Sequence, residues 1–422
     1  MSTVTFLQPL AVYTVAALAT AGVILRPFSW PEAIWAMLGA ALLVILGLLP
    51  IRDAFTGIAK GTDVYLFLIG MMLLAELARQ EGLFDWLAAR AARLAAGSAR
   101  RLFLLIYGVG TLVTIFLSND ATAVVLTPAV AAAARAARAE QPLPFLLICA
   151  FIANAASFVL PISNPANLVI YGNHMPALLQ WLPRYALPSL LSIIATYLVL
   201  RWTQRQALRL PISHEVSVPA LSLCGRIAAF GIAATAVVLM TASAFDVALG
   251  LPTFLAGLAT AGLVLSRSQC GGVLSVAKNI SWGVLPLVAG LFVLVEALDK
   301  AGLLAQLSQL LHKAGNAFPD GTAWGVGAGL AALCNVMNNL PAGLIAGNAV
   351  QAAQAPPAVT SAVLIGIDLG PNLSVTGSLA TILWLTALRR EGQQVSAWAF
   401  LKLGALIMPP ALVVALAAAL IG

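Results

Sequence analysis

Long runs of apolar residues recur from one end of the chain to the other and are separated by short polar segments. Many of these runs have the length of about 17–25 residues that a helix needs to cross the hydrocarbon layer. Because lipid offers the backbone no hydrogen-bond partners, such runs are expected to be helical. The predicted spans are 5–25, 33–50, 64–79, 145–173, 185–201, 227–245, 250–266, 283–299, 358–388 and 399–421.

Four apolar stretches depart from the pattern of a simple crossing. Residues 145–173 and 358–388 are too long for one crossing and have Pro, Gly and Asn in the middle, which predicts broken helices. Residues 102–134 and 323–350 are too short for two full crossings and have a polar centre, which predicts re-entrant hairpins. The predicted fold is an all-α polytopic membrane protein of about ten transmembrane helices plus two re-entrant hairpins.

Composition supports a membrane protein and changes how the net charge is interpreted. Of 422 residues, 61% are hydrophobic and 9% are charged, whereas a soluble domain has about 25% charged residues. The first apolar run lacks a preceding basic residue and a cleavage-site pattern, so we expect a retained span and no signal peptide. The net charge of +7 is attributed to cytoplasmic loops and predicts no nucleic-acid partner.

The basic residues also predict an orientation. Arg100 and Arg101 precede the hairpin 102–134, and Arg135 and Arg138 follow it, so a re-entrant path leaves all four on one side. With both termini outside, most of the 22 Lys and Arg residues fall in the cytoplasm. That bias follows the positive-inside rule. The predicted location is the inner (cytoplasmic) membrane.

The two halves of the chain align with each other. A shift of 220 residues places the segment Gly70–Glu76 on Gly290–Glu296 and Ser118–Asn119 on Asn338–Asn339. Since five spans precede the linker, each element of the second half crosses in the opposite sense. Inverted repeats with interrupted helices are typical of secondary transporters with a site near the midplane. The predicted organisation is a first repeat, 1–201, a cytoplasmic linker, 202–224, and a second repeat, 225–422.

Polar residues gather at the four interruptions of the apolar elements. Unwound backbone frees N–H and C=O groups there, and amide and hydroxyl side chains both donate and accept hydrogen bonds. Such groups either satisfy kinks or form a shared solute cavity, and their recurrence in both repeats favours the cavity. The predicted solute-binding residues are Ser118, Asn119, Thr122, Asn164, Asn167, Asn338, Asn339, Asn372, Thr376, Gly377 and Ser378.

Two pairs of acidic residues in the apolar elements have different expected roles. Asp120 and Asp368 stand at polar breaks, one in each half, and intramembrane carboxylates commonly belong to proton relays. We therefore predict proton coupling at these two residues, with a structural cap on a hairpin tip as the alternative. Glu76 and Glu296 are repeat mates near helix ends, where Arg79 and Lys300 are the expected partners at helical spacing.

Other chemistries find no support in the sequence. The cysteines show no paired spacing that suggests a disulfide or a structural zinc site; they are Cys149, Cys224, Cys270 and Cys334. No phosphate-binding GxxxxGK[ST] motif is present. An intramembrane enzyme needs a nucleophile–base pair or a metal cluster, and the apolar segments offer neither. The sequence predicts a transporter, not an enzyme, with no cofactor and no metal.

Three segments resemble the ArsB family of arsenite/antimonite efflux pumps. They are Phe116–Pro128, Ile280–Glu296 and Ile367–Trp384, and the resemblance extends from about Ile45 to Pro410. It implies export of arsenite and antimonite in exchange for protons by an elevator-like motion. It also implies an optional ArsA-type cytoplasmic ATPase as partner, and related transporters are often homodimers.

Alternatives within transport remain open at this point. Related sodium symporters for divalent anions usually have Ser-Asn-Thr at both hairpin tips. The tips here are Ser118-Asn119-Asp120 and Asn338-Asn339-Leu340, which argues against a sodium-coupled dicarboxylate carrier. A carrier of dicarboxylate or inorganic anions predicts a basic side chain near the cavity or a cage of carbonyl oxygens for sodium. A neutral metalloid hydroxide needs amides and hydroxyls and no fixed cation. A channel is a further possibility, which tight proton exchange would exclude.

Overall fold

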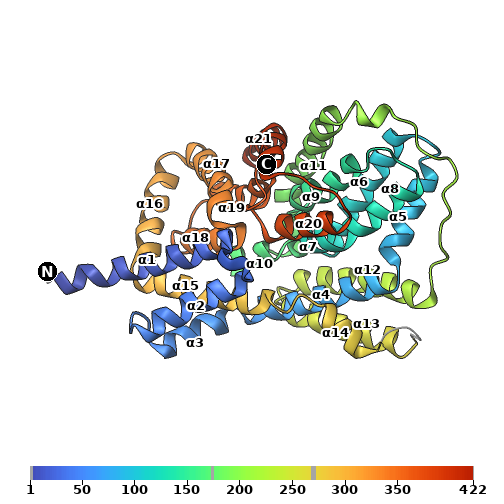
Figure 1. Ribbon diagram of the computed structural model, residues 1–422. Coiled ribbons are helices and arrows are strands. Elements are labelled where there is room, and N and C mark those ends of the chain that lie inside the picture. Colours follow the sequence, from blue (N-terminus) through green and yellow to red (C-terminus); the bar gives the residue numbers. More distant parts are fainter. Residues whose placement is uncertain (1–2, 173–174, 268–271, 422) are drawn as a thin grey trace.

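The computed structural model describes residues 3–172, 175–267 and 272–421 (Figure 1). Helices dominate these residues, and the described part of the chain contains no named β-strand. Cys270 and residue 173, the last of the first predicted broken helix, lie outside the described residues. The prediction of an all-α fold is confirmed.

Several helices have the length and composition of membrane spans. Within the described residues five helices pass both criteria, and the number rises to seven if two bent helix pairs each count as one span. The five are α1 (Thr3–Leu25), α6 (Ala99–Phe116), α11 (Leu178–Thr203), α12 (Leu223–Ala244) and α21 (Ala397–Ile421). The polytopic membrane fold is thereby confirmed. The number of about ten crossings includes shorter and broken helices and stays a prediction.

Two bent pairs contain short helices that the sequence pattern did not predict. In the first pair α3 (Ile51–Lys60) meets α4 (Thr62–Gln80) at 48°. In the second pair α14 (Val273–Asn279) meets α15 (Val284–Lys300) at 45°. Gly61 forms the first joint, where a Cβ would meet the ring of Tyr65. The absence of a side chain at Gly61 leaves room for the Tyr65 ring beside the bend.

The predicted breaks coincide with ends of helices. α6 ends at Phe116, and α7 (Asn119–Ala121) begins three residues later, followed by a π-helical turn at 122–126 and α8 (Thr127–Ala136). The other breaks separate α9 (Leu143–Ala155) from α10 (Pro165–Tyr171), α17 (Pro319–Met337) from α18 (Asn339–Ala352), and α19 (Pro357–Leu369) from α20 (Leu379–Arg390). The re-entrant path of the two hairpins remains a prediction.

The helices form two layers in Figure 1. The lower layer holds α1 to α4 and α12 to α15, including α2 (Glu32–Ile45) and α13 (Gly250–Leu265). Here α4 packs against α13 and α2 against α15. In the upper layer α17 packs against α19, α11 against α21 and α10 against α18. Each layer therefore combines elements from both halves of the chain.

Two helices outside the breaks connect the layers. α5 (Leu83–Leu94) contacts α4 in the lower layer and α6 and α8 in the upper layer. α16 (Leu303–Ala317) likewise contacts α15 below and α17 and α18 above. The residue before each of these helices is a glycine with positive φ, Gly82 before α5 and Gly302 before α16. Any residue with a side chain would be strained in this backbone conformation. These connections hold the layers together at both ends of the molecule.

Candidate functional site

A narrow cavity between the layers is lined by residues from all four polar breaks. Its volume is about 10 Å³, close to the space that one water molecule occupies. The lower layer contributes Leu68 and Val284. The upper layer contributes Asn119, Asp120, Asn164, Pro165, Asn339, Leu340, Ser378, Leu379 and Ala380. Every polar side chain of the lining thus comes from the upper layer.

The turn between α6 and α7 is held by hydrogen bonds among its own residues. The Ser118 hydroxyl accepts from the backbone N–H of Ala121 at 3.2 Å, and the Asn119 side chain accepts from the N–H of Asp120 at 2.9 Å. Thr122 bonds the Thr114 hydroxyl at 2.8 Å and is fully buried. Asn119 and Asp120 line the central cavity, whereas Thr122 anchors the returning chain to α6.

The second tip is joined to the break between α19 and α20. Asn338 has φ +70°, and its side chain accepts from the N–H of Leu340 at 3.3 Å. The N–H of Asn339 donates to the carbonyl oxygen of Gly377 at 2.9 Å. Thr376 donates to the carbonyl oxygen of Asn335 at 2.9 Å. Asn339 and Ser378 of the neighbouring break therefore line the cavity. Asn338, Thr376 and Gly377 do not line it, and their hydrogen bonds connect the two segments or stabilise the turn.

Asp368 and Asn164 form a polar contact between the two halves of the chain. The Asn164 side-chain nitrogen donates to one carboxyl oxygen of Asp368 at 2.7 Å. Asp368 is fully buried, and among the described residues its other oxygen has no hydrogen-bond partner. Asn164 also caps α10 by accepting from the N–H of Ala166 at 3.0 Å. Asp368 reaches the cavity only through Asn164, because it is not itself a lining residue.

Two of the predicted asparagines are buried away from the cavity. Asn167 donates to the carbonyl oxygens of Ser157 at 2.9 Å and Pro161 at 3.3 Å. Asn372 donates to the carbonyl oxygen of Phe151 at 3.1 Å. Asn167 thereby supplies a donor to buried carbonyl groups of the first break, and Asn372 ties the second break to α9. The structure thus places them as supports for the breaks and not as lining residues.

Asn154 is a polar residue of the site that the sequence pattern did not indicate. Its side-chain nitrogen donates to Asn372 at 3.0 Å and lies 3.4 Å from the Thr381 hydroxyl. Its side-chain oxygen accepts from Ser378, which lines the cavity, at 3.5 Å. Asn154 lies inside the apolar run of α9, so only its position one residue before the helix end hints at this role. It joins the two broken helices.

Two wider clefts lie between the layers. One has a volume of about 300 Å³ and shares Leu68, Asp120, Pro165 and Val284 with the central cavity. Its other lining residues include Glu76, Arg79, Ser118 and Arg390. We call it the Arg79 cleft. Asp120 therefore lines both the central cavity and the Arg79 cleft.

The second cleft, called here the Lys60 cleft, has a volume of about 210 Å³. Its lining includes Lys60, Asp63, Glu296, Asn348 and Gln351. Among the described residues it shares no lining residue with the central cavity. The two clefts correspond under the repeat, since Glu76 of one and Glu296 of the other are repeat mates. Of the two clefts as described, the Arg79 cleft is the one that shares lining residues with the central cavity.

The ion pair at the Arg79 cleft has the helical spacing that was expected. Arg79 donates to both carboxyl oxygens of Glu76, at 2.7 and 2.6 Å. Gln80 donates to the same carboxylate at 2.7 Å. Glu76 is buried, so these donors compensate the loss of its hydration. The prediction of this pair is confirmed.

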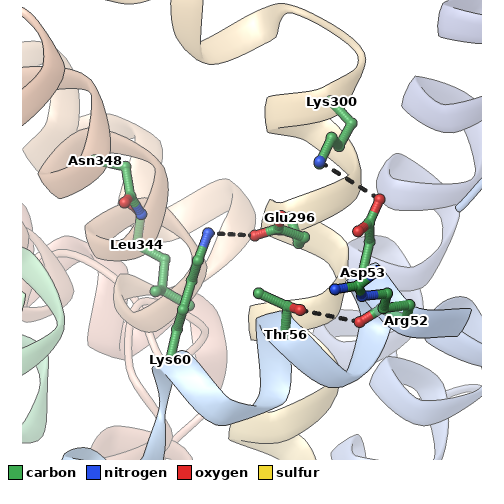
Figure 2. Close-up of polar contacts among 8 residues, drawn as sticks. All are labelled: Arg52, Asp53, Thr56, Lys60, Glu296, Lys300, Leu344 and Asn348. Atoms are coloured by element: carbon green, nitrogen blue, oxygen red, sulfur yellow. Dashed lines mark hydrogen bonds and ion pairs between the residues drawn. The ribbon is translucent and has the colours of Figure 1, made fainter. Parts of the chain in front are cut away.

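The corresponding prediction for Glu296 and Lys300 is wrong. Glu296 accepts from Lys60 of α3 at 2.5 Å, and Lys300 pairs with Asp53 of the same helix at 3.4 Å (Figure 2). The physical reason is that α3 packs against α15. This packing gives Glu296 and Lys300 oppositely charged partners on α3 in place of each other. The sequence pattern did not predict the short helix α3. Helical spacing alone therefore could not indicate that its side chains would be the partners of Glu296 and Lys300.

Comparison with known proteins assigns the family. The model of the citrate transporter family, CitMHS, matches residues 17–369. The chain belongs to this family. Arsenical pump membrane proteins of Escherichia coli and Yersinia enterocolitica are 27% and 28% identical to it, over 91% and 90% of this chain and 92% and 91% of theirs. The resemblance to arsenical pumps seen in the sequence is thereby confirmed.

A solved transporter shows the same fold. The YdaH transporter of Alcanivorax borkumensis superimposes with a TM-score of 0.57 at 16% identity, covering 88% of this chain and 86% of that one. At this identity the likeness concerns the fold alone. Family, relatives and fold together show that this CitMHS member is an integral membrane transporter, as the sequence predicted.

Proposed function

We propose that this CitMHS member exports the trivalent metalloid hydroxides arsenite and antimonite from the cytoplasm in exchange for protons. Its similarity to arsenical pump membrane proteins supports the substrate class. The chemistry of the central cavity supports the same class independently. The proposed location is the inner membrane, with an ArsA-type ATPase and a second copy of the chain as the partners that the resemblance implies.

The observation that carries the proposal is the set of polar groups around the central cavity. The polar lining consists of Asn119, Asp120, Asn164, Asn339 and Ser378, and no lysine, arginine or histidine is among the residues described there. Amides and hydroxyls exchange hydrogen bonds with a neutral hydroxide in both directions. A multiply charged carboxylate instead favours arginine or lysine as its partner. The lining therefore fits arsenous acid better than citrate.

Proton exchange is assigned to the two intramembrane acids. Asp120 lines both the central cavity and the Arg79 cleft, so a proton on its carboxyl can reach solute and cleft alike. Asp368 bonds Asn164 through one oxygen, and its other oxygen has no partner in the part of the chain that the structure describes. Protonation of the second oxygen would convert the carboxyl group of Asp368 from an acceptor alone into a hydrogen-bond donor as well. We assign exchange with the cytoplasm to Asp120 and a linked protonation to Asp368.

The two layers support alternating access of the elevator type. The upper layer supplies every polar group of the cavity, and the lower layer supplies Leu68 and Val284. A sliding movement of the upper layer would carry the site from one cleft to the other without rebuilding it. The positive-inside rule assigns Arg79 and Arg390 to the cytoplasm, so the Arg79 cleft is the inward opening in this proposal. The repeats 1–201 and 225–422 would then exchange roles between the two states.

Citrate is the second candidate, because the family model bears its name and because Arg390 lines the Arg79 cleft. Everted vesicles containing the chain separate the two substrates. We expect ATP-energised vesicles to accumulate arsenite and antimonite but not labelled citrate. Asn339→Leu, which removes a lining amide, should abolish uptake, whereas the exposed Asn316→Leu should retain it. Citrate uptake without metalloid uptake would overturn the proposal and favour an anion carrier.

A further inference from the structure

A concave basic pocket lies at one end of α11 and shares no described lining residue with the central cavity. It has a volume of about 350 Å³. Its charged lining residues are four arginines, Arg100 at the start of α6, Arg201 and Arg205 at and beyond the last turn of α11, and Arg209. No acidic residue is among the described lining residues. We call it the arginine pocket.

The charges of the arginine pocket are not compensated by acidic residues within the described part of the chain. All four arginine side chains are exposed, and none forms an ion pair within the described part of the chain. The Arg205 guanidinium lies 4.8 Å from the centre of the Trp202 ring, an arrangement that orients its donors. Four like charges gathered in one hollow repel each other and are stabilised by a polyanion. The pocket is therefore suited to an anion with more than one negative charge.

The depth of the arginine pocket points to the membrane as the source of that anion. The candidate span of α11 ends at Thr203, so Arg201 and Arg205 flank the point where the chain leaves the hydrocarbon layer. Leu198 and Trp202 line the same pocket and are 56% and 57% exposed. Exposed apolar and aromatic side chains beside arginines are characteristic of the lipid headgroup level. A phosphate at that level belongs to a phospholipid.

A groove beside the arginine pocket provides space for the rest of such a lipid. Trp202 and Arg205 line both hollows. The groove has a volume of about 750 Å³ and runs between α9, α11 and α21. Leu147 and Leu406 are among its apolar lining residues, and Lys402 adds a further positive charge. Acyl chains can lie along the leucines while the phosphate stays with the arginines.

We propose that the arginine pocket binds the headgroup of an anionic phospholipid, preferentially one with two phosphates. Guanidinium groups bind phosphate oxygens through two parallel hydrogen bonds, which favours arginine over lysine at such sites. Basic pockets between membrane helices at the cytoplasmic side are known lipid headgroup sites. The pocket lies within the upper layer and the linker, so the proposal stands apart from the identity of the transported solute.

Binding to the full-length purified chain in detergent tests this proposal. Native mass spectrometry would measure retention of cardiolipin, phosphatidylglycerol and phosphatidylcholine. The pocket variant carries Arg201→Gln, Arg205→Gln and Arg209→Gln. The control carries Arg90→Gln, Arg93→Gln and Arg226→Gln, which remove the same charge from exposed positions that do not line the pocket. Equal elution on size exclusion establishes that both variants are folded.

We expect cardiolipin to bind the wild type and the control alike, and the pocket variant at least tenfold more weakly. Phosphatidylglycerol should bind less tightly than cardiolipin, and phosphatidylcholine should show no dependence on the pocket. Equal cardiolipin binding to the pocket variant and the control would overturn the proposal. Displacement of cardiolipin by micromolar pyrophosphate would also overturn it, since the pocket would then be a site for soluble anions.

Discussion

At the scale of single residues, the same residue type performs two different tasks in this transporter. Asn119, Asn164 and Asn339 line the central cavity, whereas Asn154 and Asn167 satisfy buried groups near the breaks. The sequence could indicate polar breaks because asparagine beside proline or glycine interrupts an apolar run. It could not separate lining from supporting residues, because that distinction depends on partners such as Asn372, 218 positions from Asn154.

Loss of the Asn154 side chain should destabilise the junction of the two broken helices. Asn154→Ala leaves the buried Asn372 oxygen and Ser378 hydroxyl with fewer partners, at a cost of about 1–3 kcal/mol. We expect a lower melting temperature in detergent and reduced transport. The exposed Asn316→Ala should leave the melting temperature unchanged. Equal melting temperatures of the two variants would show that the Asn154 hydrogen bonds contribute nothing to stability.

The ion pair between Lys60 and Glu296 should be disrupted when one charge is reversed and restored when the two charges are exchanged. Lys60→Glu places a second carboxylate beside the buried Glu296, so melting temperature and transport should both fall. The double variant Lys60→Glu/Glu296→Lys should recover at least half of each loss. Arg52→Glu, on the same helix but without an ion pair in the described structure, serves as the matched control. Failure of the double variant to recover either property would contradict a direct interaction.

At the scale of elements, glycine permits close approach of α17 and α19 within the upper layer. A Cβ at Gly366 would meet the carbonyl oxygen of Gly327 and lie 3.1 Å from its carbonyl carbon. Small residues at such contacts are typical of helix pairs in membranes, where close packing drives association. Since α19 carries Asp368, the same contact also fixes the depth of that acid.

Gly366→Ala should therefore force the two helices apart and destabilise the protein by about 1–3 kcal/mol. Gly329 also lies on α17, and a Cβ added there would have no neighbouring atom within 4 Å. Gly329→Ala should be neutral or stabilising by up to about 1 kcal/mol, because alanine favours the helix. The melting temperatures of the two variants can be compared by thermal unfolding, followed by fluorescence-detected size exclusion. A loss of stability in Gly329→Ala equal to that in Gly366→Ala would contradict the importance of this helix contact.

Most elements were predictable from the sequence, because hydrophobic length determines where a helix spans lipid. Two were not. The helix α3 has ten residues that include Arg52, Asp53 and Lys60, which is too short and too polar for a span. The helix α14 is shorter still, with seven residues. α3 packs against α15 and α14 packs against α4, so each contacts a helix from the other half of the chain. Hydropathy along the sequence cannot indicate such long-range contacts.

At the scale of the whole molecule, the layered arrangement predicts access to the two clefts from opposite sides of the membrane. Ser281→Cys places a thiol in the Arg79 cleft, and Asn348→Cys places one in the Lys60 cleft. In a background without native cysteines, a membrane-impermeant maleimide should label the first only in everted vesicles and the second only in intact cells. Arsenite with a proton gradient should change the two labelling rates in opposite directions. Labelling of both thiols from the same side would contradict the proposed topology.

Coupling of the solute to protons is the property on which the proposed transport mechanism depends, and everted vesicles with an imposed pH gradient measure it. Arsenite or antimonite should dissipate the gradient in vesicles that contain the wild type. Asp120→Asn should abolish this response while arsenite still binds, and Asp368→Asn should weaken or abolish it. Proton movement driven by citrate and not by the metalloids, or an unchanged metalloid response in both variants, would contradict proton-coupled metalloid export.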